Sequence, residues 1–161
     1  MQDENMLDQN KEIARRFYEE CWNQGKVDRV DQFIAKDCRY HDPAFPSLAP
    51  GTDSLKRHIT MCRNAFPDLR FSLDDTIAER DEVVVHWTAN GTQEGPFLGV
   101  AATRKIATVT GTSIYRIKNQ KIVEQFVDET LCLEIARWRS GIRHLKWPKA
   151  REQNFKRSDR K

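Results

Sequence analysis

The sequence predicts a single α+β domain in which three N-terminal helices pack on a strongly curved, mostly antiparallel sheet and leave a cone-shaped hollow. Helical periodicity dominates the first part of the chain, and residues 69–130 alternate apolar with polar side chains at every second position. Prolines, glycines and short polar turns separate the segments. Because antiparallel strands that bury one face against helices twist strongly, helices that lean across such a sheet enclose a hollow.

The first expected helix is amphipathic and ends at Gly25, which suits a left-handed C-terminal position. Its apolar side carries Ile13, Ala14, Phe17, Tyr18, Cys21 and Trp22. A shorter helix is expected over about 27–33. A third helix begins at Thr52 or Asp53, either of which can cap it, and stops before Pro67.

Residues 41–51 separate the second helix from the third and contain three prolines and one glycine. That composition excludes regular structure. Phe45 and Leu48 are apolar, so we expect the segment to be an ordered flap.

The period-two part of the chain predicts four long strands and a closing helix. The strands are expected at about 69–77, 83–89, 105–117 and 122–130, and the helix at 131–139. In the second strand, Val83, Val85 and Trp87 share one face, and His86 lies on the other.

Composition and charge exclude several classes of protein. Of 161 residues, 39% are hydrophobic and 32% charged, which is a globular composition for one domain. No run of apolar residues is long enough to span a membrane, and the polar N-terminus without an apolar export segment predicts a cytoplasmic protein. The four cysteines are far apart and form no CxxC motif, so we expect reduced thiols and no metal site.

The charge divides the chain into a domain, 1–139, and a basic C-terminal extension, 140–161. The extension holds eight Lys and Arg against two acidic residues, a balance of +6, so the preceding residues sum to −3 within a total of +3. Cations mixed with aromatic residues can bind a nucleic-acid backbone, but a solvated extension is the more ordinary interpretation and the one that we favour.

Several segments, in this order along the chain, resemble the SnoaL-like polyketide cyclases, or ester cyclases, of the NTF2-like superfamily. They are residues 10–20, 22–25, 41–43, 66–69, 91–92, 114–117 and 121–124. The resemblance covers about 9–135 and implies a cone-shaped α+β barrel that is usually a homodimer and uses no metal or cofactor. It also implies ring closure by an intramolecular aldol step, with a carboxylate acting as acid and base in an apolar pocket.

In this family the acid usually stands just before the closing helix, where this chain has Thr130. Period-two geometry offers Asp128 on the same side of the last strand as a displaced acid or base. Glu129 is expected to point the other way and is the weaker candidate. An ordinary solvated or ion-paired aspartate remains the alternative for Asp128.

Two histidines complete the catalytic candidates. His86 lies where relatives often carry arginine, and His41 matches the family's segment that enters the flap. A neutral imidazole can donate to an enolate oxygen or relay protons, although either histidine can equally be structural. His58, on a helix expected to be exposed, is given no role.

Aromatic residues and one amide are the candidates for substrate binding: Tyr18, Trp22, Tyr40, Phe45, Gln93, Phe97 and Phe126. The rings could line a flat pocket for an apolar guest, or they could simply form the core. Gln93 stands where many relatives have histidine, and an amide can orient a carbonyl but cannot transfer protons.

Three functions therefore compete. The first is a cyclase or isomerase that acts by acid–base chemistry on a polyketide- or terpenoid-like molecule. The second is a protein that binds a small apolar or carbonyl-bearing molecule without converting it. The third is an assembly module that dimerises through its open sheet face. The enzyme requires a buried carboxylate with a shifted pKa in the cavity.

Overall fold

The structure is a computed structural model that describes residues 2–131, 135, 138 and 139. The helices are α1 (Gln2–Arg16), η1 (Phe17–Asn23), η2 (Val27–Arg29), α2 (Val30–Phe33) and α3 (Thr52–Ala65). The strands are β1 (Ile34–His41), β2 (Arg70–Glu79), β3 (Glu82–Thr92), β4 (Ile106–Lys118) and β5 (Lys121–Glu129). Helices followed by a run of long strands confirm the expected α+β class.

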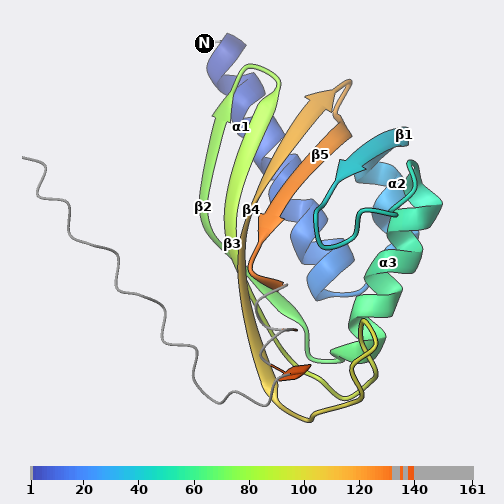
Figure 1. Ribbon diagram of the computed structural model, residues 1–161. Coiled ribbons are helices and arrows are strands. Elements are labelled where there is room, and N and C mark those ends of the chain that lie inside the picture. Colours follow the sequence, from blue (N-terminus) through green and yellow to red (C-terminus); the bar gives the residue numbers. More distant parts are fainter. Residues whose placement is uncertain (1, 132–134, 136–137, 140–161) are drawn as a thin grey trace, which may run out of the picture.

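The five strands form one curved sheet in the order β1-β5-β4-β3-β2 (Figure 1). Strands β2 to β5 are antiparallel neighbours, whereas β1 pairs with β5 in parallel. In Figure 1, α1 crosses behind the strands and α3 stands beside them, on the side of β1. We call the face toward these helices the inner face and the opposite face the outer face.

The strand alternation predicted from the sequence is confirmed in β3. Val83, Val85 and Trp87 are buried on the inner face, and His86 is exposed on the outer face. Alternation of this kind places one side of each strand in the core and the other in solvent.

The first helix extends further than expected, because α1 begins at Gln2 and continues as the wide π-helical turn η1. Its buried apolar residues are Ala14, Phe17, Tyr18, Cys21 and Trp22. Gly25 has φ 68°, a left-handed conformation that a residue with a side chain rarely adopts, and it ends this segment as predicted.

The segment between β1 and α3 has no regular structure, as its prolines predict. Helix α3 starts at Thr52, but neither Thr52 nor Asp53 caps it through a side-chain hydrogen bond. The Ser54 hydroxyl instead donates to the carbonyl of Gly51 at 2.9 Å.

Two bulges interrupt the regular pairing of the sheet. The β2–β3 register passes from Leu73 to Asp75, which leaves Asp74 as an extra residue, where the sequence predicts a disturbance. The β4–β5 register passes from Ile122 to Glu124, which leaves Val123 extra. An extra residue reverses which later side chains face inward, and the second bulge therefore decides the composition of the cavity.

Most of the expected closing helix and all of the basic extension 140–161 lie outside the described residues. Of the helix, Leu131 is buried, and Ile135 and Trp138 pack against the core. Three of the four cysteines are described, and all three are buried free thiols, as expected: Cys21, Cys38 and Cys62. Among the described helices, none is both long and apolar enough to cross a bilayer.

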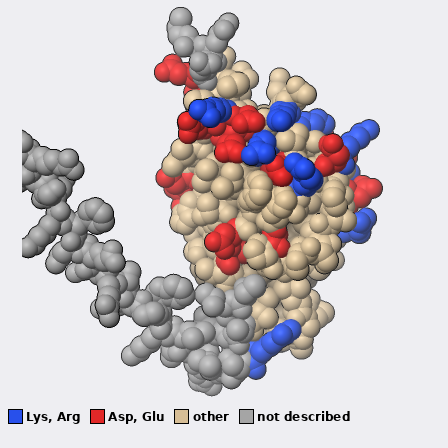
Figure 2. Space-filling model, turned by 45° about the horizontal axis from the view of Figure 1, so that its top comes forward, with Lys and Arg blue, Asp and Glu red and all other residues tan. Residues whose placement is uncertain are grey.

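The outer face of the sheet carries its side chains in rows across the strands. One row of paired residues is apolar, and we call Ile77, Val84, Ile114 and Phe126 the outer apolar row. The neighbouring row, beginning with Glu82, Arg116 and Glu124, is charged. In Figure 2, charges of both signs gather in the upper part of the visible face, and few lie in the area below them.

Candidate active site

A cavity of about 100 Å³ lies between the inner face of the sheet, α3 and the flap after β1. Of the seven residues that the sequence suggests for substrate binding, five line it: Tyr18, Trp22, Tyr40, Phe45 and Phe97. Rings from η1, the flap and the loop after β3 therefore form much of its wall. The cavity is mostly apolar, so a polar group buried in it loses much of its hydration.

Glu129, the last residue of β5, carries a carboxyl group into this cavity. Its Oε1 atom is inaccessible to solvent and has no hydrogen-bond partner among the described residues. Loss of hydration raises the pKa of Glu129 from the ordinary 4.5 to about 8, and the nearby charges of Asp42 and Asp128 raise it further in smaller measure. The cavity thus contains a carboxyl group that titrates close to neutral pH.

The bulge at Val123 explains why Glu129 faces inward. Ile122 is fully buried, and regular alternation would turn Glu124, Phe126 and Asp128 toward the same side. The extra residue reverses the pattern, so that Gln125, Val127 and Glu129 line the cavity instead.

The register places Glu129 opposite Gly111 of β4, and Gly111 opposite Trp87 of β3. A Cβ atom at Gly111 would overlap the six-membered ring of Trp87. The missing side chain therefore allows the indole to lie across β4, one strand from Glu129. An aromatic ring in this place helps to keep water from the carboxyl group.

Asp42, directly after β1, brings a second carboxyl group to the cavity wall. Its Oδ1 accepts a hydrogen bond from the backbone N–H of Ala44 at 2.8 Å. Burial raises the pKa of Asp42, while hydrogen bonds from the backbone of Ala44 and Phe45 act in the opposite direction by stabilising the charged form. The two carboxyl groups are thus held in different surroundings.

Helix α3 contributes His58 and Cys62, whose Nε2 and Sγ atoms lie 3.9 Å apart. Loss of hydration lowers the pKa of His58 to about 4, so its imidazole is neutral near pH 7. Burial raises the pKa of the Cys62 thiol, and the charges of Glu129 and Asp42 raise it further. A neutral thiol beside a neutral imidazole is not an activated nucleophile.

A fixed hydrogen-bond cluster lies at the inner wall of the cavity. The Trp87 indole donates to the Ser113 hydroxyl oxygen at 3.0 Å, and the Tyr18 hydroxyl lies 3.0 Å from the same oxygen. Burial raises the pKa of Tyr18, so the phenol stays protonated and can act only as a neutral donor or acceptor.

Three residues that the sequence suggested for the site lie on the outer face of the sheet and not in the cavity. Asp128 and Phe126 lie on the outer face because of the bulge, and both are exposed rather than turned into the cavity. His86 is also exposed on the outer face, with its Nδ1 3.8 Å from Asp74. The expected inward orientation of Asp128 is therefore wrong, and Glu129, the candidate expected to point outward, occupies the cavity.

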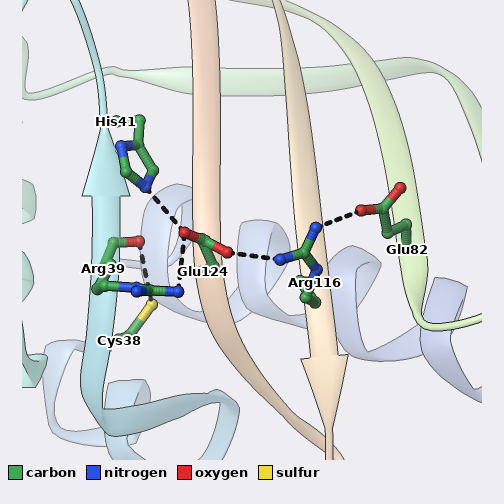
Figure 3. Close-up of polar contacts among 6 residues, drawn as sticks. All are labelled: Cys38, Arg39, His41, Glu82, Arg116 and Glu124. Carbon is green, nitrogen blue, oxygen red and sulfur yellow. Dashed lines mark hydrogen bonds and ion pairs between the residues drawn. The ribbon is translucent and has the colours of Figure 1, made fainter.

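His41 lies at the rim of the cavity, but its imidazole belongs to a charged ladder on the outer face (Figure 3). Its Nε2 is 3.0 Å from Glu124, and its ring stacks on Phe126 at 4.4 Å. Glu124 also pairs with Arg39 at 3.1 Å and Arg116 at 2.8 Å. The hydrogen bond from His41, together with the two arginines, lowers the pKa of Glu124.

Gln93 is fully buried and does not line the cavity. Its amide nitrogen donates to the carbonyls of Gly95, Val100 and Ala101, and its amide oxygen accepts from the backbone and hydroxyl of Thr103. All of these partners lie in the loop between β3 and β4. The expectation that Gln93 contacts a ligand is wrong, because its amide holds this loop in place.

Thr130, which stands at the family's usual acidic position, is bonded to the backbone of β4. Its hydroxyl oxygen accepts from the N–H of Thr110 at 3.1 Å. The chain therefore has no acid at that position, and Glu129 provides one from the preceding residue.

The sequence interpretation missed Asp42, His58 and Ser113 as cavity residues. For His58 a signal was present, because it lies three residues after Leu55 and four before Cys62, on the buried stripe of α3. Ser113 lies on the inner side of β4, between buried Tyr115 and Gly111. Among the described residues, no group of three or more His, Cys, Asp or Glu side chains is placed to bind a metal.

Comparison with solved structures gives the same fold. TsrD from Streptomyces laurentii superposes with a TM-score of 0.73 at 23% identity, over 81% of this chain and 94% of that chain. A protein from Jannaschia sp. CCS1, provisionally assigned as a SnoaL-like polyketide cyclase, gives 0.74 at 22% identity, over 82% and 92%. One from Acidithiobacillus ferrooxidans, provisionally a polyketide cyclase, gives 0.72 at 25%, over 82% and 95%.

No curated protein sequence matches this chain significantly. The family model for SnoaL-like polyketide cyclases matches residues 12–127, which include α3, the flap and all but the end of β5. The fold, with helices on the inner face of a curved five-stranded sheet, is the NTF2-like cone. The chain belongs to the SnoaL-like polyketide cyclase family.

Proposed function

We propose that this protein is an enzyme of the cyclase or isomerase type that uses Glu129 for acid–base chemistry on a small carbonyl-bearing molecule. One observation carries the proposal: a carboxyl group with a pKa raised to about 8, whose Oε1 has no hydrogen-bond partner among the described residues, faces an apolar cavity. Family membership supports the cyclase class.

The chemistry requires a proton to be moved next to a carbonyl group while negative charge develops on the carbonyl oxygen. A positioned acid or base contributes about 10²–10⁴-fold when its pKa is near the working pH. Glu129 meets this condition, whereas an ordinary solvated glutamate is a much weaker base. The apolar wall also strengthens electrostatic interactions with the developing charge.

The cavity sets the size of the group that reacts. Its volume of about 100 Å³ is smaller than the roughly 150 Å³ of an engineered cavity that binds benzene. We therefore expect the reacting part of the substrate to be no larger than one small ring. A longer polyketide- or terpenoid-like molecule would have to extend past the flap, where Phe45 and Leu48 line the cavity.

Exchange of α-protons in D₂O tests the proposal without knowledge of the natural substrate. Cyclopentanone, cyclohexanone and 1-indanone serve as ketones of increasing size, and loss of the α-proton signal is followed by ¹H NMR. We expect the protein to accelerate exchange of at least one ketone, and Glu129→Gln to reduce the acceleration at least tenfold. Acceleration that is equal in the variant, or absent for all three ketones, contradicts the proposal.

A binding protein without catalysis is the second candidate, because an aromatic-lined cavity can hold a ligand without converting it. Chemical-shift changes of the cavity residues on addition of ketone, with no exchange of its α-protons, would favour this function over the enzyme.

We further propose that the protein forms a homodimer through the outer face of the sheet. The outer apolar row supports this proposal, since Ile77, Ile114 and Phe126 are 59%, 36% and 38% exposed. A row of exposed apolar side chains across neighbouring strands is typical of an interaction surface.

A further inference from the structure

We propose that Asp42 and Glu129 divide the two proton-transfer roles in the cavity. Asp42 is the carboxylate base, and Glu129 is the neutral carboxylic acid that faces the carbonyl oxygen of the substrate. This inference rests on the proposed function and adds a second catalytic residue to it. It follows from the hydrogen bonds that each carboxyl group receives.

Asp42 receives backbone hydrogen bonds that favour its ionised form, although burial raises its pKa as well. The Ala44 N–H donates to its Oδ1 at 2.8 Å, and the turn is closed by a second bond, from the Phe45 N–H to the Asp42 carbonyl, at 3.1 Å. Backbone donors favour the charged form of a carboxyl group. With Oδ1 engaged in the turn, Oδ2 is the atom that can accept a proton from carbon.

Glu129, in contrast, lies in surroundings that favour its neutral form. Its Oε1 is closed off from solvent and receives no hydrogen bond from the described residues. The cavity lining includes no lysine or arginine among those residues, so no such cation faces the carboxyl group. A charge at Glu129 would remain uncompensated, whereas the neutral acid can donate to a ligand.

The other titratable groups around Glu129 agree with this division. Tyr18 of η1 and Cys62 of α3 both have raised pKa values and stay neutral, and His58 of α3 has its pKa lowered to about 4. Asp42 is therefore the carboxyl group of the pair whose charged form is better stabilised, and its charge disfavours a second charge on Glu129.

The roles give a balanced reaction. Asp42 takes the proton from the carbon beside the carbonyl, and the electron pair of the broken C–H bond forms a C=C bond. The carbonyl π electrons move to oxygen, which receives a hydrogen bond or the proton from Glu129. The enol then attacks a second carbonyl carbon in the same molecule, whose oxygen takes the proton held by Asp42, and a ring closes; alternatively, a conjugated enol takes that proton at another carbon. In both cases the enol O–H returns its proton to Glu129 as the first carbonyl re-forms.

Ketone exchange in three variants separates base from acid. Asp42→Asn keeps an oxygen that can accept from Ala44 but removes the base, so we expect a loss of about 10²–10⁴-fold. Glu129→Gln keeps an N–H donor, and we expect about a tenfold loss. Glu129→Leu removes the donor, with an expected loss of about 10²–10³-fold.

Asp128→Asn is the matched control, because it removes the adjacent carboxyl group on the outer face, whose charge contributes least to the raised pKa of Glu129, and we expect exchange to change far less than in the cavity variants. The division of roles would be overturned if Glu129→Gln lost all exchange activity while Asp42→Asn kept full activity. The proposed function would survive that result, with Glu129 as the base.

A titration that needs no activity provides the second test. The carboxyl carbon of Glu129, identified by its absence in Glu129→Gln, is followed by ¹³C NMR as pH is raised. We expect its midpoint to fall when Asp42→Asn removes the neighbouring charge. An unchanged midpoint overturns the division, whereas a lower midpoint in a protein that exchanges no ketone would contradict the proposed function alone.

Discussion

The hydroxyl groups of Tyr18 and Ser113 lie 3.0 Å apart at the wall of the cavity, although the two residues are separated by 95 positions in the chain. Trp87 donates to the same Ser113 oxygen, also at 3.0 Å. A single small hydroxyl thus connects η1, β3 and β4. It fixes the orientation of two of the rings that enclose Glu129.

Ser113→Ala should destabilise the protein, because the Trp87 N–H and the Tyr18 hydroxyl would both lose a buried partner. We expect a loss of about 1–3 kcal/mol in the free energy of unfolding, measured with urea. Thr112→Ala, one residue away on the outer face, is the control and should change stability by less than about 0.5 kcal/mol. Equal losses in the two variants would contradict the role of the cluster.

Gln93→Ala should release the loop between β3 and β4. The fully buried amide makes bonds to four residues of that loop, and its removal takes a hydrogen-bond donor from the carbonyls of Gly95 and Ala101. We expect a loss of about 2–3 kcal/mol in unfolding free energy and faster amide exchange in the loop. Glu94→Ala, an exposed neighbour, is the control. Unchanged exchange at Val100 and Thr103 would be incompatible with this role.

Much of the fold could be predicted from the sequence because its signals are local. The prolines of the flap, Gly25 and the alternation in β3 each act within a few residues, and each predicts the element that the structure shows. The aromatic wall followed from the same signals, since Tyr18 and Trp22 lie on the apolar stripe of the first helix.

The catalytic acid could not be predicted in this way, because its orientation depends on a single extra residue in β5. Whether Val123 bulges is decided by how Ile122 and Glu124 pair with Ile117 and Arg116 of β4 across the hairpin, and the alternation of residues within β5 alone does not reveal that pairing. Period-two reasoning across that bulge selects Asp128, one residue from the group that lines the cavity.

The outer apolar row makes the proposed homodimer testable. Ile114→Glu places a charge in the middle of the row, between Val84 and Phe126. We expect light scattering to give twice the chain mass of 18.8 kDa for the natural protein and the single mass for the variant. Met61→Glu, at an exposed apolar residue of α3, is the control and should stay dimeric. A natural protein that is monomeric at micromolar concentration would contradict the proposal.

Glu129 should also make the stability of the protein depend on pH. Its pKa is raised from 4.5 when unfolded to about 8 when folded, so the folded state holds a proton that the unfolded state releases between these values. The stability that the neutral carboxyl group contributes is therefore fully present below about pH 4.5. It decreases as pH rises and is absent above about pH 8.

Replacing Glu129 with a side chain that cannot ionise should prevent this loss of stability at high pH. We expect Glu129→Gln to match the natural protein near pH 4.5 and to exceed it by about 2–4 kcal/mol in unfolding free energy at about pH 8.5. Urea unfolding at several pH values measures the difference. Asp128→Asn, which removes the exposed neighbouring carboxyl group, should stay within about 0.5 kcal/mol of the natural protein near pH 8.5. If Glu129→Gln differed from the natural protein by the same unfolding free energy at both pH values, Glu129 would ionise as freely in the folded cavity as in the unfolded chain. The carboxyl group would then be too well solvated to serve as the proposed acid.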